Sequence, residues 1–187
     1  MAAYKRSRTQ QILAVAVVAA AALLKLWLDQ YDEHGNRRPA RSEGGPVAAP
    51  SAPGELQELR VERVVDGDTL LLEPDHTRAR LQGIDTPETV KEDTPVQKWG
   101  PEATQYTKDF IRGAGGRVQI EVDGEYADQY GRRLVFVWNG DRLLNEELVR
   151  EGLARPKLAY DYSQAKKDRL KAAQRDAQRA RRGLWSD

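Results

Sequence analysis

Carboxylates gather in two short segments that also carry turn-forming residues. The first segment is Asp66-Gly67-Asp68-Thr69 and the second is Asp85-Thr86-Pro87-Glu88. Alone, each is most often an ordinary turn, because turns favour Asp, Gly and Pro. Together they offer Asp68 and Asp85 to a hard cation such as calcium, which binds carboxylate, carbonyl and water oxygens. Glu88 follows Asp85 closely enough to hold a water beside that cation.

Two arginines accompany these carboxylates. Arg80 precedes the second acidic segment, and Arg132 ends the run Asp128-Gln129-Tyr130-Gly131-Arg132. A guanidinium group binds phosphate through paired N–H groups, and it stabilises the charge that builds up on phosphoryl oxygens during displacement. A cation, a carboxylate base and two guanidinium groups are what metal-assisted phosphodiester hydrolysis requires.

Composition excludes several other chemistries. The chain of 187 residues contains no Cys, so disulfide scaffolds, cysteine–zinc sites, iron–sulfur clusters and thiol catalysis are excluded. His34 and His76 are the two histidines, and neither lies in a motif that supports a Ser-His-Asp triad. The length suggests one domain with extensions, and 40% hydrophobic with 32% charged residues is typical of a globular core.

Alternating apolar residues predict five short strands in the region that carries these motifs. The expected strands are 59–65, 69–72, 80–84, 117–122 and 134–138. Three helices are expected as well: one that Pro101 and Glu102 begin and Gly113 ends, one over 144–150, and one from Ser163 to about Arg182. The fold class is therefore α+β, mainly β, with a small closed barrel that carries helices on its outside.

The first 55 residues differ from this region. A basic flank precedes an uncharged run from Ile12 to Leu24, and the apolar stretch continues to Leu28. We expect residues 1–28 to be a basic flank and transmembrane anchor, with a cleaved signal peptide or a peripheral helix as alternatives. Residues 29–55, with four Pro and four Gly, are expected to be a flexible linker. Because the basic flank stays inside, the domain of residues 56–187 is expected outside the cytoplasm, either anchored or secreted.

Charge is unevenly distributed behind a formal net charge of +1. Residues 56–149 hold 12 Lys and Arg against 19 Asp and Glu, whereas residues 150–182 hold 11 against 4. The basic final helix is most simply a solvated face, but it is also a candidate for attracting nucleic acid or anionic lipid.

The region from about Leu59 to Asp187 resembles the staphylococcal nuclease (thermonuclease) family. The resemblance rests on a set of motifs in matching order: 65–69, Arg80, 84–89, 100–103, Asp128, 130–132, 145–154 and 184–186. It implies an OB-like five-stranded barrel with three helices. It also implies a calcium-dependent hydrolase that cleaves DNA and RNA with little sequence preference and leaves 3′-phosphates.

The resemblance implies a role for each matching residue. Arg80, Glu88 and Arg132 would be catalytic, Glu88 as the general base and the arginines on the scissile phosphate. Calcium would bind the carboxylates of Asp68 and Asp85 and the carbonyl of Thr86, with Asp66 behind them. The nucleotide pocket would be lined by Tyr130, Tyr160 and Tyr162.

The sequence also departs from the family pattern. Residues 155–160 are about two residues longer than usual, and Glu92 and Asp93 occupy a loop that is usually rich in lysine. The alternative function is a non-catalytic nucleic-acid-binding module tethered to the membrane, but such a module is expected to lack one or more of five side chains that are all present here: Asp68, Arg80, Asp85, Glu88 and Arg132. No obligate protein partner is inferred, and a monomer is the default expectation.

Overall fold

The computed structural model describes residues 54–89 and 95–186. The expected anchor, and the linker up to residue 53, lie outside the described residues. Within the described part of the chain, no helix is both long enough and apolar enough to cross a membrane.

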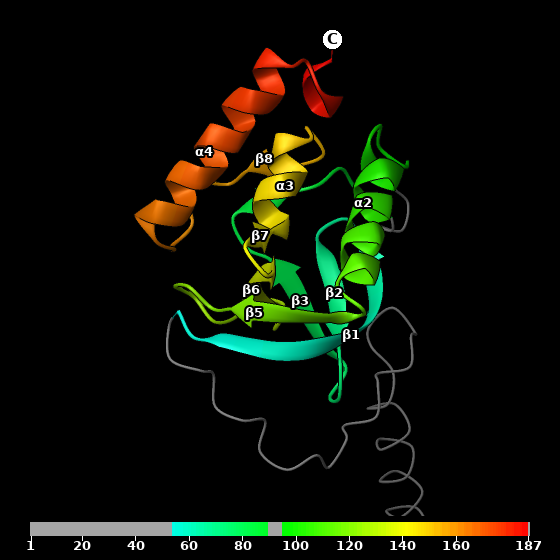
Figure 1. The fold of residues 1–187 in the computed structure, drawn as a ribbon, viewed down its shortest axis with the longest axis vertical. Helices are drawn as coiled ribbons and strands as arrows, with labels where there is room; N and C mark the ends of the chain where they lie inside the picture. Colours follow the sequence, from blue (N-terminus) through cyan, green and yellow to red (C-terminus); the bar gives the residue numbers. More distant parts are fainter. Residues whose placement is uncertain (1–53, 90–94, 187) are drawn as a thin grey trace, which may run out of the picture. The chain divides into compact units, whose positions relative to one another are not determined.

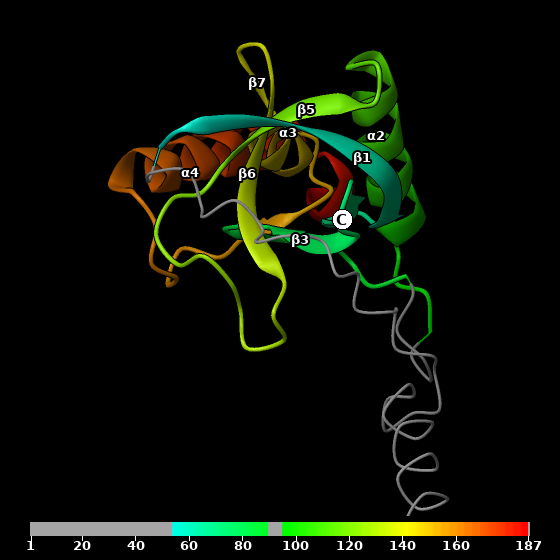
Figure 2. The same cartoon turned by 90° about the horizontal axis from the view of Figure 1, so that it is seen from below.

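Five strands form a closed barrel (Figures 1 and 2). The long strand β1 (Leu56–Asp66) pairs through its first half with β5 (Arg117–Glu121) and through its second half with β2 (Thr69–Leu72). Strand β2 also pairs antiparallel with β3 (Thr77–Leu81), and β5 pairs antiparallel with β6 (Arg133–Asn139). A parallel pairing of β3 with β6 closes the ring, which leaves no open edge between these strands. The predicted five-stranded OB-like barrel with three helices is thereby confirmed.

Three very short strands were not predicted. They are β4 (Ile84–Asp85), β7 (Arg142–Leu143) and β8 (Arg155–Pro156). The predicted strand over 80–84 is wrong in its bounds, because Gly83 has a φ of 76° and turns the chain out of β3. The chain then enters β4, which pairs antiparallel with β8, so residues 83–85 and 155–157 lie side by side.

The helices lie close to their predicted positions. Helix α2 spans Gly100–Gly113, α3 spans Leu144–Arg150 and α4 spans Gln164–Arg179, followed by the short 3-10 turn η1 (Gly183–Trp185). Helix α4 ends before the predicted Arg182 because Arg181 adopts a left-handed φ of 50°. The Arg182 N–H then donates to the Ala177 carbonyl, which closes the helix end.

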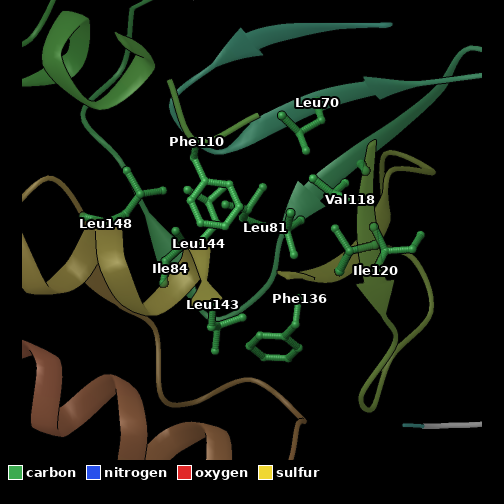
Figure 3. Close-up of a cluster of buried hydrophobic side chains, with 14 of the residues drawn as sticks. Leu70, Leu81, Ile84, Phe110, Val118, Ile120, Phe136, Leu143, Leu144 and Leu148 are labelled. Carbon is green, nitrogen blue, oxygen red and sulfur yellow. The ribbon is translucent and has the colours of Figure 1, made fainter. Parts of the chain in front are cut away.

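The core fills the space between the barrel and the helices. Figure 3 shows side chains from β2, β3, β5 and β6 pointing toward Phe110 of α2 and toward leucines of α3. Helix α3 lies between α2 and α4, and α4 packs through Leu170, Ala173 and Ala177 (Figure 1). Small alanines bring α4 close, so α3 and α4 fix the segment between them, which contains β8.

Candidate active site

The turn between β1 and β2 is held tightly from outside. Gly67 lies so close to its neighbours that a Cβ there would be 2.8 Å from Thr86 Oγ1 and 2.9 Å from the Cβ of Ala103 in α2. The Gly67 carbonyl also accepts a hydrogen bond from Thr107 Oγ1 at 2.7 Å. The Asp-Gly-Asp motif therefore needs its central glycine because α2 and the β4 segment press on the turn.

This turn buries the carboxylate of Asp68, whose residue is 1% exposed. One carboxylate oxygen accepts the Thr86 N–H at 2.9 Å. The other lies 3.2 Å from Thr69 Oγ1 and also contacts the Arg80 guanidinium. A buried carboxylate is stable only when it is paired and hydrogen-bonded, as Asp68 is here.

Arg80 connects the two carboxylates that were predicted as calcium ligands. Its Nη1 contacts Asp68, and its Nη2 lies 2.7 Å from Asp85 Oδ1. The two nitrogens of one guanidinium group thus reach both acids. The structure therefore brings Asp68, Asp85 and Arg80 together at the ends of β2, β3 and β4.

A cavity of about 280 Å³ opens beside this group. Arg80, Asp85, Arg132, Lys157 and Tyr160 are among the residues that line it. The cavity therefore joins residues from β3, β4, the loop before β6 and the segment that follows β8. Three cationic side chains at one hollow form a site suited to phosphate.

Asp128 holds Arg132 at the cavity. Its Oδ2 lies 2.8 Å from Arg132 Nε, and its Oδ1 accepts the backbone N–H groups of Tyr130 and Arg132 at 3.0 Å each. Partial burial acts to raise the pKa of Asp128, but the hydrogen bonds from Arg132 outweigh it, so the pKa lies below its ordinary value. Asp128 is thus a charged clamp that orients Arg132 through both its backbone and its side chain.

Helix α2 positions Glu88. Its first residue, Gly100, packs so closely that a Cβ would be 2.9 Å from the Pro87 carbonyl oxygen. The Glu88 N–H donates to Gln97 Oε1 at 3.1 Å, and the Gln97 N–H donates back to the Glu88 carbonyl at 3.0 Å. The Thr89 N–H contacts Glu88 Oε1 at 3.0 Å. Backbone contacts on both sides therefore fix the place of Glu88.

Glu88, Asp66 and both arginines share one electrostatic environment. Burial raises the pKa of Asp66, and the charge of Glu88 acts in the same direction, whereas Thr69 and Arg80 oppose it. Burial lowers the pKa of Arg80, with the positive charge of Arg132 acting the same way and Asp85 opposing. Asp66 also supports the turn directly, since its Oδ1 accepts the Asp68 N–H at 3.0 Å.

The three predicted pocket tyrosines have different surroundings. Tyr160 is 57% exposed and lines the cavity, while Tyr130 is 75% exposed with the Arg132 guanidinium 5.5 Å from its ring centre. Tyr162 is the most buried of the three: it is 5% exposed and packs against Phe136 in the core, and its hydroxyl donates to the Lys157 carbonyl at 2.9 Å. Burial raises the pKa of Tyr162 to about 12.

The donor set fits a hard cation. Asp68 and Asp85 both present carboxylate oxygens to the Arg80 guanidinium, so both acids face a common point where positive charge is favourable. Among the described residues no cluster of three or more His, Asp or Glu could hold a metal ion by itself. Two carboxylates and the Thr86 carbonyl would leave the remaining positions to water or substrate, as in sites where the cation also contacts the reactant.

Sequence reasoning missed two residues of this site. Asp128 stands two residues before Tyr130 and four before Arg132, a spacing at which an Asp carboxylate readily accepts backbone N–H groups. That spacing could have predicted the contact, but Asp128 is named above only as part of the motif set, without a role. Lys157, whose Nζ lies 3.3 Å from Asp85 Oδ2, gave no signal because only the β4–β8 pairing brings it there.

The closed barrel and its paired carboxylates and arginines define a class of protein: an OB-like barrel enzyme with an acidic centre beside a phosphate pocket. Comparison with known families agrees. Residues 78–187 match the family model described as "Staphylococcal nuclease homologue". The chain belongs to the staphylococcal nuclease family, and it is a hydrolase of the nuclease class.

Several relatives cover most of the chain. It is 40% identical over 149 residues to the thermonuclease of Staphylococcus hyicus, which covers 78% of this chain and 86% of that protein. It is 41% identical over 143 residues to the thermonuclease of Staphylococcus intermedius, covering 75% and 83%. It is also 34% identical over 137 residues to the SPbeta prophage-derived endonuclease YokF of Bacillus subtilis, covering 71% of this chain and 45% of that protein.

Proposed function

We propose that this nuclease depends on calcium and hydrolyses the phosphodiester bonds of DNA and RNA without sequence preference, leaving 3′-phosphates. The observation that carries the proposal is the contact of Arg80 with both Asp68 and Asp85 at the wall of a cavity that also holds Arg132. The site offers contacts to phosphate and exposed tyrosine rings, and binding through these groups does not depend on base sequence.

Arg80 and Arg132 bind the scissile phosphate. Each presents N–H groups to the non-bridging oxygens, and their positive charge stabilises the negative charge that grows there as phosphorus becomes five-coordinate. Asp128 keeps the Arg132 fork in place through the 2.8 Å contact at Nε. Tyr130 and Tyr160, both largely exposed, contact the nucleotide beside that phosphate.

Glu88 is the general base. It accepts a proton from the attacking water while the water oxygen bonds to phosphorus and the bond from phosphorus to the 5′ oxygen breaks. The 5′ oxygen leaves as a hydroxyl after it takes up a proton, and the phosphate remains on the 3′ side. Asp68, Asp85 and the Thr86 carbonyl would hold the calcium ion, which when bound supplies Lewis-acid polarisation of the phosphate.

The test is degradation of plasmid DNA and of a single-stranded RNA by the full chain, with calcium and with excess chelator. Cleavage with calcium, none with chelator, and 3′-phosphate ends on the products are expected. Full hydrolysis in chelator would contradict the calcium requirement. Binding of both nucleic acids without any cleavage would instead support the non-catalytic alternative.

We also propose that residues 1–28 hold the nuclease at a membrane with its catalytic domain outside the cytoplasm. The support is the sequence alone: a basic flank followed by an uncharged apolar run. Fractionation of expressing cells should find the full chain in membranes, accessible to protease from outside. Recovery of a shortened chain in the medium would favour signal cleavage.

A further inference from the structure

Strand β8 lies between two cavities. The first is the 280 Å³ cavity with Arg80 and Arg132, and the second, of about 220 Å³, is lined by Thr86, Lys98 and Arg155 among others. Asp85 lines both cavities. A chain of phosphates whose scissile member lies at Asp85 therefore has a hollow on either side.

Strand β8 and the residue that follows it supply one cation to each cavity. Lys157 lines the first cavity and Arg155 lines the second. Arg155 lies in β8 opposite Asp85, and Lys157 follows directly after the end of the strand. They flank the Asp85 position with positive charge on both sides.

The backbone of this segment is held firmly. Arg155 and Pro156 pair with Asp85 and Ile84, and the Lys157 N–H donates to the Gly83 carbonyl at 2.7 Å. The Lys157 carbonyl accepts from the buried Tyr162 hydroxyl at 2.9 Å. Both polar groups of the Lys157 backbone are thus used, and its position relative to Asp85 is fixed.

The two side chains nevertheless reach solvent. The Lys157 side chain is 46% exposed and its Nζ lies 3.3 Å from Asp85 Oδ2. Arg155 is exposed, with its guanidinium carbon 4.6 Å from the Trp185 ring centre. Stacking on a ring leaves the guanidinium N–H groups at its edge available to an anion.

We propose that Arg155 and Lys157 form a phosphate rail that binds the two phosphates flanking the scissile one in a single-stranded polynucleotide. Each cavity has room for about one nucleotide of a single strand and is too small for a duplex. The rail explains how a domain whose residues 56–149 are acidic overall captures a polyanion, because it places two cations along the substrate path. This inference rests on the proposed nuclease function and names its extended substrate contacts.

The test compares the full chain with the double variant Arg155→Gln/Lys157→Gln. Binding of a dye-labelled octathymidylate is followed by anisotropy in chelator, so that no cleavage occurs, across salt concentrations. Each lost phosphate contact should reduce the slope of log affinity against log salt by about 0.7. From 50 to 200 mM salt, the wild-type affinity should therefore fall about sevenfold more than the affinity of the double variant.

Steady-state kinetics provide a second test of the phosphate rail. With calcium, the double variant should lose more kcat/KM on the octanucleotide than on a dinucleotide that has one phosphodiester and no terminal phosphate. The matched control is Arg60→Gln/Arg117→Gln, the same charge change at exposed arginines that line neither cavity. It should leave the salt slope unchanged.

Three outcomes would overturn the rail: an unchanged salt slope in the double variant, an equal change in the control, or equal losses on the dinucleotide and the octanucleotide. Failure of the proposed function has a different signature. The wild-type chain would then cleave neither substrate. The salt dependence of octathymidylate binding in chelator would still show whether Arg155 and Lys157 contact phosphates.

Discussion

At the scale of single residues, Arg80 combines several contacts of the site in one side chain. One side chain contacts the two carboxylates that we propose as calcium ligands and also faces the phosphate cavity. Its guanidinium stays charged throughout the physiological pH range even though burial lowers its pKa. The roles of the surrounding residues can therefore be tested one at a time.

Glu88→Gln should abolish most turnover without removing the nucleic-acid site. The amide keeps the shape of the side chain but cannot accept the proton, so kcat should fall by about 10²–10⁴. Binding of octathymidylate in chelator should stay within about twofold of wild type. The control is Glu102→Gln, the same change at an exposed position in the first turn of α2, and an unchanged kcat for Glu88→Gln would remove it as the base.

Asp128→Asn should weaken the hold on Arg132. Loss of the charge-assisted contacts should raise KM for oligonucleotides by roughly tenfold and lower stability by about 1 kcal/mol at pH 7. Steady-state kinetics and urea unfolding measure the two effects. Asp141→Asn, at an exposed turn position, is the matched control.

The pH dependence of this effect has a definite sign. The pKa of Asp128 is lower in the folded state, so its contribution is fully present above the ordinary carboxyl pKa of about 4 and disappears as pH falls through the lower folded value. The difference in unfolding free energy between wild type and Asp128→Asn should therefore shrink in acid. A difference that grows as pH falls would contradict the clamp.

At the scale of residues, the sequence predicted which side chains carry the chemistry better than it predicted which neighbours each side chain contacts. Asp68, Asp85 and Arg80 could be predicted to converge because each lies at the end of an expected strand in a small barrel. Tyr162 and Lys157 could not, because their positions depend on whether residue 83 pairs with residue 157, a contact between segments far apart in the sequence. Side-chain type carries no information on such a pairing.

At the scale of elements, a buried asparagine of helix α3 makes hydrogen bonds to the barrel. Asn145 accepts the Val137 N–H at 3.0 Å and donates to the Gln82 and Val135 carbonyls at 2.9 and 3.2 Å. It thereby links α3, β6 and the residue that follows β3. The asparagine also fixes the segment that leads from Arg80 toward Asp85.

Asn145→Ala should therefore destabilise the whole domain. The Val137 N–H and the Gln82 carbonyl would lose these partners in the interior, which costs about 2–4 kcal/mol in total. Urea unfolding of the variant should give a lower midpoint with an unchanged slope. Gln178→Ala, at an exposed position of α4, should stay within about 0.5 kcal/mol of wild type, and a loss below 1 kcal/mol at Asn145 would contradict the linking role.

Periodicity predicted the long elements and failed for the short ones. Strands β1, β2, β5 and β6 and all three helices were expected within a few residues, because each buries one face over several repeats. Strands β4, β7 and β8 have two residues each, too few for any alternation to be seen. Two of these three matter for the cavities: β4 contains Asp85, which lines both, and β8 contains Arg155 and is followed by Lys157, which line one each.

At the scale of the whole molecule, two carboxylates on one side of Arg80 should couple calcium binding to folding. An ion that binds only the folded chain stabilises it by about 2.7 kcal/mol at 100 times its Kd. For a chain of this size the Tm should rise by about 5–10 °C. Thermal unfolding with calcium and with chelator measures the shift.

The matched variant is Asp85→Asn, because the side chain of Asp85 is 47% exposed and its loss should spare the fold. The calcium-dependent rise in Tm should largely disappear in that variant and persist in Asp141→Asn. A rise of equal size in Asp85→Asn would place the ion elsewhere.

The parallel pairing of β3 with β6 has a further consequence, in the timing of folding. Its partners, Ala79 with Arg133 and Arg80 with Leu134, are distant in the sequence, so loop-closure entropy makes this contact slow to form compared with the local hairpins. Arg80 lies on one closing strand and Arg132 immediately precedes the other. A partly folded chain therefore lacks the pair of arginines that we propose bind phosphate, and we expect it to be inactive until the barrel has closed.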